Sequence, residues 1–214
     1  KILEFHEPFN YSRANNFAAN KASGEVLLFL NNDMEIISPD WLEEMLVHAV
    51  RPAVGTVGAK LLFPNNTIQH AGVIVGIGKV ASHGHKGYDR ASIGYGGRLI
   101  LTHNVAASTA ACLMMRKEVF QQVGGFNRDY NLAYGDSDLC RRVLEKKLVN
   151  VWTPFAELYH HESKTRGMEE SPEQIARYQN EVFLFQKRWG KFIRKGDPYY
   201  NPNLSLEHED FRWG

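Results

Sequence analysis

A short apolar segment that ends in three polar residues constrains the fold most strongly. Residues 25–30 read Glu-Val-Leu-Leu-Phe-Leu and are followed at once by Asn31, Asn32 and Asp33. A nearly continuous apolar run of this length is typical of a strand covered on both faces of a parallel sheet. Polar residues at the carboxyl end of such a strand face the crevice where open α/β sheets bind ligands. We therefore expect a buried strand and a ligand-binding edge at residues 31–33.

Helical and strand patterns alternate along the chain. Small and apolar residues at helical spacing predict a helix that stops at Ser23-Gly24, and Ser38 and Pro39 provide a cap and a first helical position for the next one. The predicted helices span 11–22, 41–50, 117–123, 137–147 and 173–189, and the further strands span 54–62, 110–115 and 149–153. This order predicts an α/β fold, a mostly parallel sheet flanked by helices.

Two segments fall outside this alternation. Residues 63–99 are rich in Gly, His and turn residues, and we expect a functional loop there with a short strand at 73–77. Residues 197–214 are rich in Pro, Asn and charge, and we expect a tail that wraps the surface or reaches another domain.

Composition restricts the classes of function. The 25 Lys and Arg residues nearly balance the 24 Asp and Glu residues, so nucleic acid is not an expected partner. Cys112 and Cys140 have no metal-site or disulfide spacing, which favours a reducing, cytoplasmic setting. No apolar stretch reaches the ~20 residues of a membrane span, although the inner face of a membrane remains a possible location.

Asp33 is the first candidate for metal binding. A divalent ion held by one or two carboxylates neutralises the charge that a leaving nucleoside diphosphate develops. The alternative is that residues 31–33 form only an Asx turn leading to the next helix.

Asp136 is the candidate general base. It stands with Asp138 at the start of a predicted helix, where free N–H groups and the helix dipole favour carboxylates as caps. Asp138 fits that capping role, whereas Asp136 could point into the crevice and take a proton from an acceptor hydroxyl. Capping by both carboxylates remains the alternative.

His160 and His161 follow the last predicted strand. A neutral imidazole binds divalent metals well, so one of the two histidines could complete a site with Asp33. Because adjacent side chains point in different directions, at most one is expected to bind. The alternative is a pair of surface histidines.

Taken in order, these clusters resemble the inverting family 2 glycosyltransferases, especially rhamnosyltransferase-like members that build bacterial surface polysaccharides. The likeness covers residues 5–170 and lies in the order of the motifs more than in any one of them. Its elements are Asn16, Ala-Ser-Gly at 22–24, Leu-Asn-Asn-Asp at 30–33, Gln-His-Ala-Gly at 69–72, the segment 109–120, Val-Gly-Gly-Phe at 123–126, the segment 134–141 and Tyr-His-His-Glu at 159–162.

The resemblance implies a fold of the glycosyltransferase A (GT-A) type and a role for each cluster. Residues 31–33 would be the DXD-type motif, with Asp33 on the metal and Asn31 facing the nucleotide; Asn32 completes this nucleotide-binding set. Asp136 would be the catalytic base and His160 a metal ligand. Gly135 stands where the family usually has Glu, and Asn residues replace the first aspartates of the DXD triplet.

Three basic residues are candidates for contacts with the diphosphate. Arg141, Lys164 and Arg166 lie near the second and third clusters in the sequence. Solvated basic side chains are the alternative for all three.

The family also begins with a βαβ segment that holds the nucleoside, and we find no counterpart before Lys1. We therefore expect residues 1–195 to form a partial GT-A domain without that segment and residues 196–214 to form a tail or linker. Such a chain could pair with a second copy or with further domains of a longer chain.

The predicted activity is metal-dependent transfer of a sugar from a nucleotide-diphosphate sugar to a glycan or lipid-linked saccharide, with inversion and with Mg or Mn as cofactor. A non-catalytic fragment or sugar-binding scaffold with this frame is the main alternative. A metal-dependent hydrolase that uses Asp33, Asp136 and His160 is the other.

Overall fold

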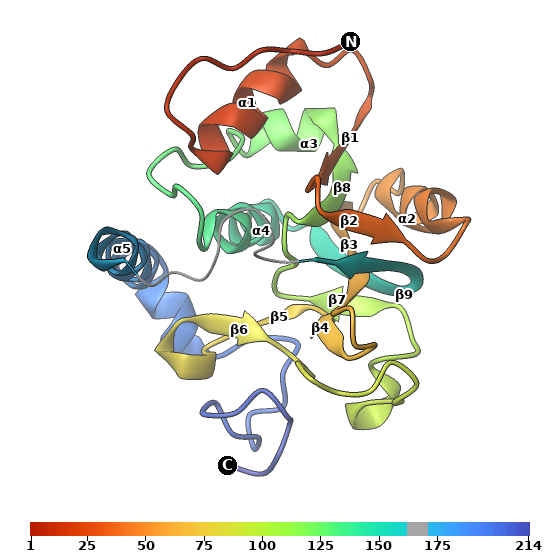
Figure 1. Cartoon of the computed structure of the whole chain (residues 1–214). Coiled ribbons are helices and arrows are strands. Elements are labelled where there is room, and N and C mark those ends of the chain that lie inside the picture. Colours follow the sequence, from red (N-terminus) through yellow and green to blue (C-terminus); the bar gives the residue numbers. More distant parts are fainter. Residues whose placement is uncertain (162–170) are drawn as a thin grey trace.

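A computed structural model describes residues 1–161 and 171–214 (Figure 1). The helices are α1 (Tyr11–Lys21), α2 (Trp41–Ala49), α3 (Lys117–Gln122), α4 (Gly135–Glu145) and α5 (Pro172–Lys195), with the 3₁₀ turns η1 (Ile77–Lys79) and η2 (Tyr95–Gly97). The strands are β1 (Val26–Leu30), β2 (Met34–Ile36), β3 (Val54–Leu62), β4 (Ile68–His70), β5 (Val73–Val75), β6 (Ala81–His83), β7 (His103–Val105), β8 (Cys112–Arg116) and β9 (Val149–His160).

The central sheet has the strand order β1-β8-β3-β9-β2, with β4 beside β3 and β7 beside β9. Among these pairs β3 and β9 are parallel, and the others are antiparallel. The expected α/β sheet flanked by helices is confirmed, but its pairing is mixed rather than mostly parallel. The reason is that β8 lies between β1 and β3 and runs against both.

Helices cover both faces of the sheet, with α2 on one side and α4 on the other (Figure 1). The core under α2 contains Trp41 and Met45 with residues of β3, β8 and β9. The core on the opposite face joins α1, α3 and α4 to β1 and β8 through Phe29, Phe120 and Phe126. Burial on two faces explains why residues 25–30 read as an almost uninterrupted apolar run.

Most element boundaries agree with the sequence patterns, but several differ. Helix α5 continues to Lys195 instead of ending at 189. Strand β9 continues to His160 instead of ending at 153, because β2 and the end of β3 pair with it beyond the predicted segment. Strands β2 and β7 are three residues long and gave no pattern of their own. The predicted loop at 63–99 contains the hairpin β5–β6, which starts at the expected strand.

The tail at 197–214 packs on this hairpin and on the turn that follows it. Asp197 accepts a 2.9 Å hydrogen bond from the Val75 N–H, and the Tyr88 hydroxyl donates to the carbonyl of Asp210 at 2.9 Å. The Phe211 ring stacks on His85 with centroids 3.9 Å apart. In the described chain the tail therefore wraps its own domain, one of the two arrangements expected.

No helix in the described ranges is both long and apolar enough to cross a membrane.

Candidate functional site

Asp33 and His160 meet because the chain turns sharply after β1. Strand β2 pairs with the end of β9, with Met34 opposite His160, and the His161 N–H donates to the Asp33 carbonyl at 2.9 Å. This pairing brings residue 33 beside residue 160, although the two lie far apart in the sequence. Asp33 Oδ1 lies 3.2 Å from His160 Nε2.

His160 is held in one orientation by Gln69, the middle residue of β4. The His160 Nδ1 atom lies 2.7 Å from Gln69 Oε1, and the Gln69 amide reaches the His160 carbonyl at 3.4 Å. An amide oxygen only accepts, so we infer that Nδ1 carries the imidazole proton and that Nε2 presents its lone pair. A second partner that fixes the tautomer in this way is typical of metal-binding histidines.

The residues present fit a divalent ion. Asp33 Oδ1 is buried without a hydrogen-bond donor, and it faces the unprotonated Nε2 of His160. Two lone pairs directed at one point are stabilised by a shared cation. Within the described ranges no group of three or more His, Cys, Asp or Glu side chains gathers. A pair of protein ligands suits an ion that takes its other ligands from a diphosphate.

The two asparagines of the motif differ in position. Asn31 Nδ2 lies 3.3 Å from His160 Nε2, and the Asn31 backbone N–H donates to Ala111 at 2.9 Å. Asn31 therefore lies beside His160, while Asn32 is exposed at the turn.

Asp136 lies at the first turn of α4, next to β8. Its Oδ2 accepts from the Ala110 N–H at 3.1 Å and its Oδ1 from the Ser137 N–H at 2.6 Å. Burial raises the pKa of this carboxyl above its usual value, and these hydrogen bonds oppose the shift. Because the Asn31 N–H bonds to the adjacent residue Ala111, Asp136 and the Asp33–His160 pair border the same strand end. A carboxylate with a raised pKa is suited to general base catalysis.

Gly135 is closely packed at the start of α4. A Cβ there would lie 3.3 Å from Ser12 Oγ and 3.4 Å from Tyr130 Cβ, so a side chain at this position would require a small shift of its neighbours.

Asp138 does not cap α4, contrary to expectation. Its side chain is fully buried and binds Arg142 Nε at 2.8 Å, Arg188 Nη1 at 3.2 Å and Trp189 Nε1 at 2.9 Å. A buried carboxylate needs such partners, so Asp138 ties α5 to α4.

Arg141 lies against α5 rather than among the clustered site residues. Its guanidinium stands 4.3 Å from the Phe192 ring centre and 5.0 Å from that of Trp189, and it pairs with Glu145 at 3.6 Å. The cation–π contacts give it a packing role. Lys164 and Arg166, the other basic candidates, lie outside the described residues.

Sequence reasoning missed a histidine pair beside His160. His70 Nδ1 and His83 Nδ1 are 2.8 Å apart, and His70 Nε2 accepts from the Thr109 N–H at 3.4 Å. Burial lowers the pKa of both imidazoles, that of His83 to about 4, which keeps them neutral. The His-rich character of residues 63–99 was the only available signal, and it did not indicate which histidines meet.

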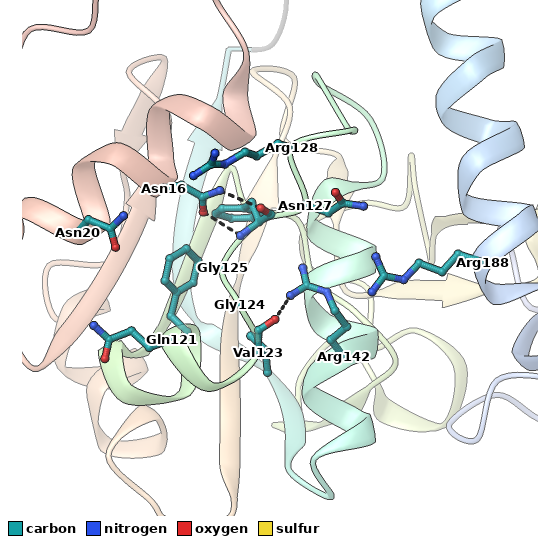
Figure 2. Close-up of a pocket in the computed structure, with 12 residues that line it drawn as sticks. Asn16, Asn20, Gln121, Val123, Gly124, Gly125, Asn127, Arg128, Arg142 and Arg188 are labelled. Atoms are coloured by element: carbon teal, nitrogen blue, oxygen red, sulfur yellow. Dashed lines mark hydrogen bonds between the residues drawn. The ribbon is translucent and has the colours of Figure 1, made fainter.

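A cavity of about 610 Å³ lies elsewhere, between α1, α3 and α4 (Figure 2). Asn16 forms part of its wall and makes two 2.8 Å hydrogen bonds with Phe126. The Asn16 amide donates to the Phe126 carbonyl and accepts from the Phe126 N–H. Of its three arginines, Arg142 and Arg188 already bind Asp138. None of the predicted site residues lines this cavity, and its described contacts are those of a structural packing region.

The α/β sheet flanked by helices is that of a GT-A glycosyltransferase. The sequence profile described as Glycosyl transferase family 2 matches residues 1–124, more than half of the chain. The chain belongs to this family.

Relatives extend the match over nearly the whole chain. Protein y4gI of Sinorhizobium fredii is 50% identical over 212 residues, which cover 99% of this chain and 23% of the relative. The O-antigen biosynthesis protein RfbC of Myxococcus xanthus is 43% identical over 209 residues, which cover 97% of this chain and 16% of the relative. An N-acetylglucosaminyl-diphospho-decaprenol L-rhamnosyltransferase of Mycobacterium tuberculosis is 30% identical over 83 residues, 38% of this chain and 27% of that enzyme. The chain thus spans less than a quarter of the length of the first two.

A solved structure supports the fold. GalNAc-T7, determined with UDP, GalNAc and Mn²⁺, superposes with a TM-score of 0.62 at 10% identity, covering 88% of this chain and 38% of that one. The expected GT-A type fold is therefore confirmed.

Proposed function

We propose that this chain carries the metal-binding and acceptor-side part of an inverting glycosyltransferase. It would transfer a sugar from a nucleoside-diphosphate sugar to a glycan or lipid-linked saccharide. The observation that carries the proposal is the approach of Asp33 Oδ1 to the unprotonated Nε2 of His160, beside the buried carboxylate of Asp136.

Asp33 and His160 would hold a Mg or Mn ion, with Asn31 at the nucleotide. When bound, such an ion neutralises the charge that develops on the diphosphate. The presence of Mn²⁺ with UDP in the GalNAc-T7 structure supports this expectation. Gln69 keeps the metal-binding nitrogen of His160 directed at Asp33.

Asp136 would act as the base in a direct displacement. Its carboxylate takes the proton of the acceptor hydroxyl while that oxygen bonds to the anomeric carbon. The bond from the anomeric carbon to the diphosphate oxygen breaks in the same step, and the diphosphate leaves with the electron pair. Attack opposite the leaving group inverts the anomeric configuration.

The nucleoside would be held beside β1. In the described chain β1 pairs with β8 alone, and Leu30 at its end is 44% exposed. An open edge of this kind accepts further strands. We propose that a nucleoside-binding segment adds here, and that the reaction takes place in the cytoplasm, where the free cysteines Cys112 and Cys140 stay reduced.

The test compares nucleotide-sugar binding and turnover with and without Mn. Asp33→Ala should abolish metal-dependent binding, whereas Asp136→Asn should keep binding and lower turnover about 10²- to 10⁴-fold. Asp40→Asn is the matched control, because Asp40 is exposed and makes no side-chain capping bond. The same set is measured in a version with an added amino-terminal βαβ segment.

Each outcome separates the alternatives. Binding only after the segment is added identifies the isolated chain as an inactive part of the enzyme. Metal-independent binding that survives Asp33→Ala contradicts the proposed site. Rapid donor hydrolysis without an acceptor, and no transfer when one is present, favours a hydrolase.

A further inference from the structure

A second cleft adjoins Asp136 and has a different chemical character from the metal site. It has a volume of about 390 Å³ and is lined by residues of η1 and β6, the turn before α4, α5 and the C-terminal tail. This volume is within the ~300–1,000 Å³ typical of small-molecule sites. The side chains that give it its chemistry are Ser82, Tyr134, Tyr178, Glu207, His208 and Glu209.

One wall of the cleft is aromatic. The hydroxyls of Tyr134 and Tyr178 are 2.8 Å apart, and their ring centres are 5.9 Å apart. Tyr134 packs on Phe185 of α5, while Tyr178 is 41% exposed at the rim. Two rings that offer both apolar faces and hydroxyl groups suit a ligand with C–H and O–H groups on the same surface.

The opposite wall is acidic and is supplied by the tail. Glu209 is fixed by the Ser82 hydroxyl, which donates to its carboxylate, and by the His85 N–H, which donates to its carbonyl at 2.8 Å. Glu207 lies two residues away and is exposed. Two carboxylates accept hydrogen bonds from hydroxyl groups and repel anions.

The cleft lies beside the proposed base. Tyr134 immediately precedes α4 and stands two residues before Asp136, and Asp136 is among the charges that raise the pKa of the Tyr134 hydroxyl. On the other side Ser82 precedes His83, which contacts His70 near His160. A molecule in the cleft therefore lies next to the turn that carries Asp136.

We propose that this cleft binds an uncharged sugar residue of the acceptor, with Tyr134 and Tyr178 against the ring and Glu207 and Glu209 on its hydroxyl groups. The inference rests on the proposed glycosyl transfer and adds to it the acceptor's subsite and charge class. It also gives the tail at 197–214 a role in acceptor selection, which excludes acidic sugars such as uronates.

Binding is tested without any turnover. Methyl glucoside and methyl N-acetylglucosaminide serve as neutral probes and methyl glucuronide as the acidic one, each followed by saturation-transfer NMR on the chain. Neutral probes should bind, and Tyr178→Ala should weaken them about tenfold. Phe183→Ala is the matched control, because Phe183 is a 58% exposed ring of the same helix outside the cleft.

The acidic wall is tested with a variant that should lose the selectivity against the acidic probe. Methyl glucuronide should not bind the wild-type chain, and the double change Glu207→Gln and Glu209→Gln should allow it to bind. Thermal unfolding of each variant checks that the tail stays docked. No binding of either neutral probe, unchanged binding in Tyr178→Ala, or equal binding of glucoside and glucuronide to the wild type would each overturn the proposal.

Turnover separates this proposal from the one on which it rests. With a neutral glycoside as acceptor, Tyr178→Ala should raise the acceptor KM about tenfold and leave the donor KM unchanged. Neutral-probe binding without any donor turnover refutes the glycosyl transfer and leaves the cleft as a sugar site. Normal turnover with an unchanged acceptor KM refutes the cleft alone.

Discussion

The carboxylate of Glu181 on α5 accepts a 2.8 Å hydrogen bond from the backbone N–H of Ala133, three residues before Asp136. The same carboxylate also accepts from the N–H groups of Asn131 at 2.5 Å and Leu132 at 3.0 Å. Glu181 is only 1% exposed, so this buried charge is compensated by three backbone donors. The turn that delivers the proposed base is thus held in place by a distant helix.

We predict that Glu181→Gln lowers the free energy of unfolding by about 1–3 kcal/mol, since a Gln side chain has one acceptor oxygen and directs N–H groups at backbone donors. Turnover should fall while donor KM stays unchanged, because the loss affects the placement of Asp136. Urea unfolding and steady-state kinetics measure the two effects. Glu145→Gln, a half-exposed carboxylate on α4, is the control. Equal losses in both variants would contradict the prediction.

Asp136→Asn should remove activity and make the free energy of unfolding less dependent on pH. Because burial raises the pKa of Asp136, the folded state retains a proton that the unfolded chain has released. Ionisation therefore lowers stability as pH rises through that pKa, and the neutral amide escapes this loss. Both carboxylate oxygens accept from backbone N–H groups, so the amide loses one acceptor at every pH. In urea unfolding, the midpoint of the variant relative to that of the wild type should therefore rise from acidic to neutral pH. A midpoint difference that does not change with pH would contradict the prediction.

Gln69→Ala should weaken Mn binding about 10- to 100-fold without removing either metal-binding side chain. The expected cause is the loss of the partner that orients His160. Calorimetry with Mn and a nucleoside diphosphate measures the change, and Asn65→Ala in the preceding turn serves as a control. An affinity equal to that of wild type would show that β9 alone orients His160.

The docking of the tail should respond to acid through His85. Burial lowers the pKa of His85 to about 3, and its Nε2 accepts from the Tyr95 N–H at 3.0 Å. The stability that its neutral form provides is present above pH 6.5 and is lost as pH falls toward 3. His85→Phe keeps a ring against Phe211. It should reduce the loss of unfolding free energy on acidification by up to about 1.4 kcal/mol per pH unit. Urea unfolding across this range tests it; parallel curves for both proteins would contradict it.

Local patterns predicted the parts of the fold that local physics determines. The apolar run before Asn31 is readable because burial restricts residue type directly. Metal-ligand chemistry suggested that Asp33 joins one of the histidines at 160 and 161, and the resemblance selected His160. The geometry of that contact depends on β2, a strand too short to leave a pattern.

Other features could not be read from the sequence at all. Glu181 and Asp138 look like ordinary helical carboxylates, and only the packing of α5 on α4 reveals that both are buried and fully engaged. The His70–His83 contact likewise depends on the β5–β6 hairpin returning alongside β4. Long-range pairing of this kind has no local signature.

Tyr134 occupies the left-handed region at φ 60°, a conformation that disfavours large side chains by roughly 1–2 kcal/mol. Contacts with Tyr178 and Phe185 hold it there, and both come from α5. The turn before Asp136 therefore keeps a strained backbone conformation that depends on contacts with a remote helix. Any event that loosens α5, whether a neighbouring domain, a ligand or a change elsewhere on the helix, would let this turn relax. The carboxylate of Asp136 would then be displaced, although the event itself does not contact it.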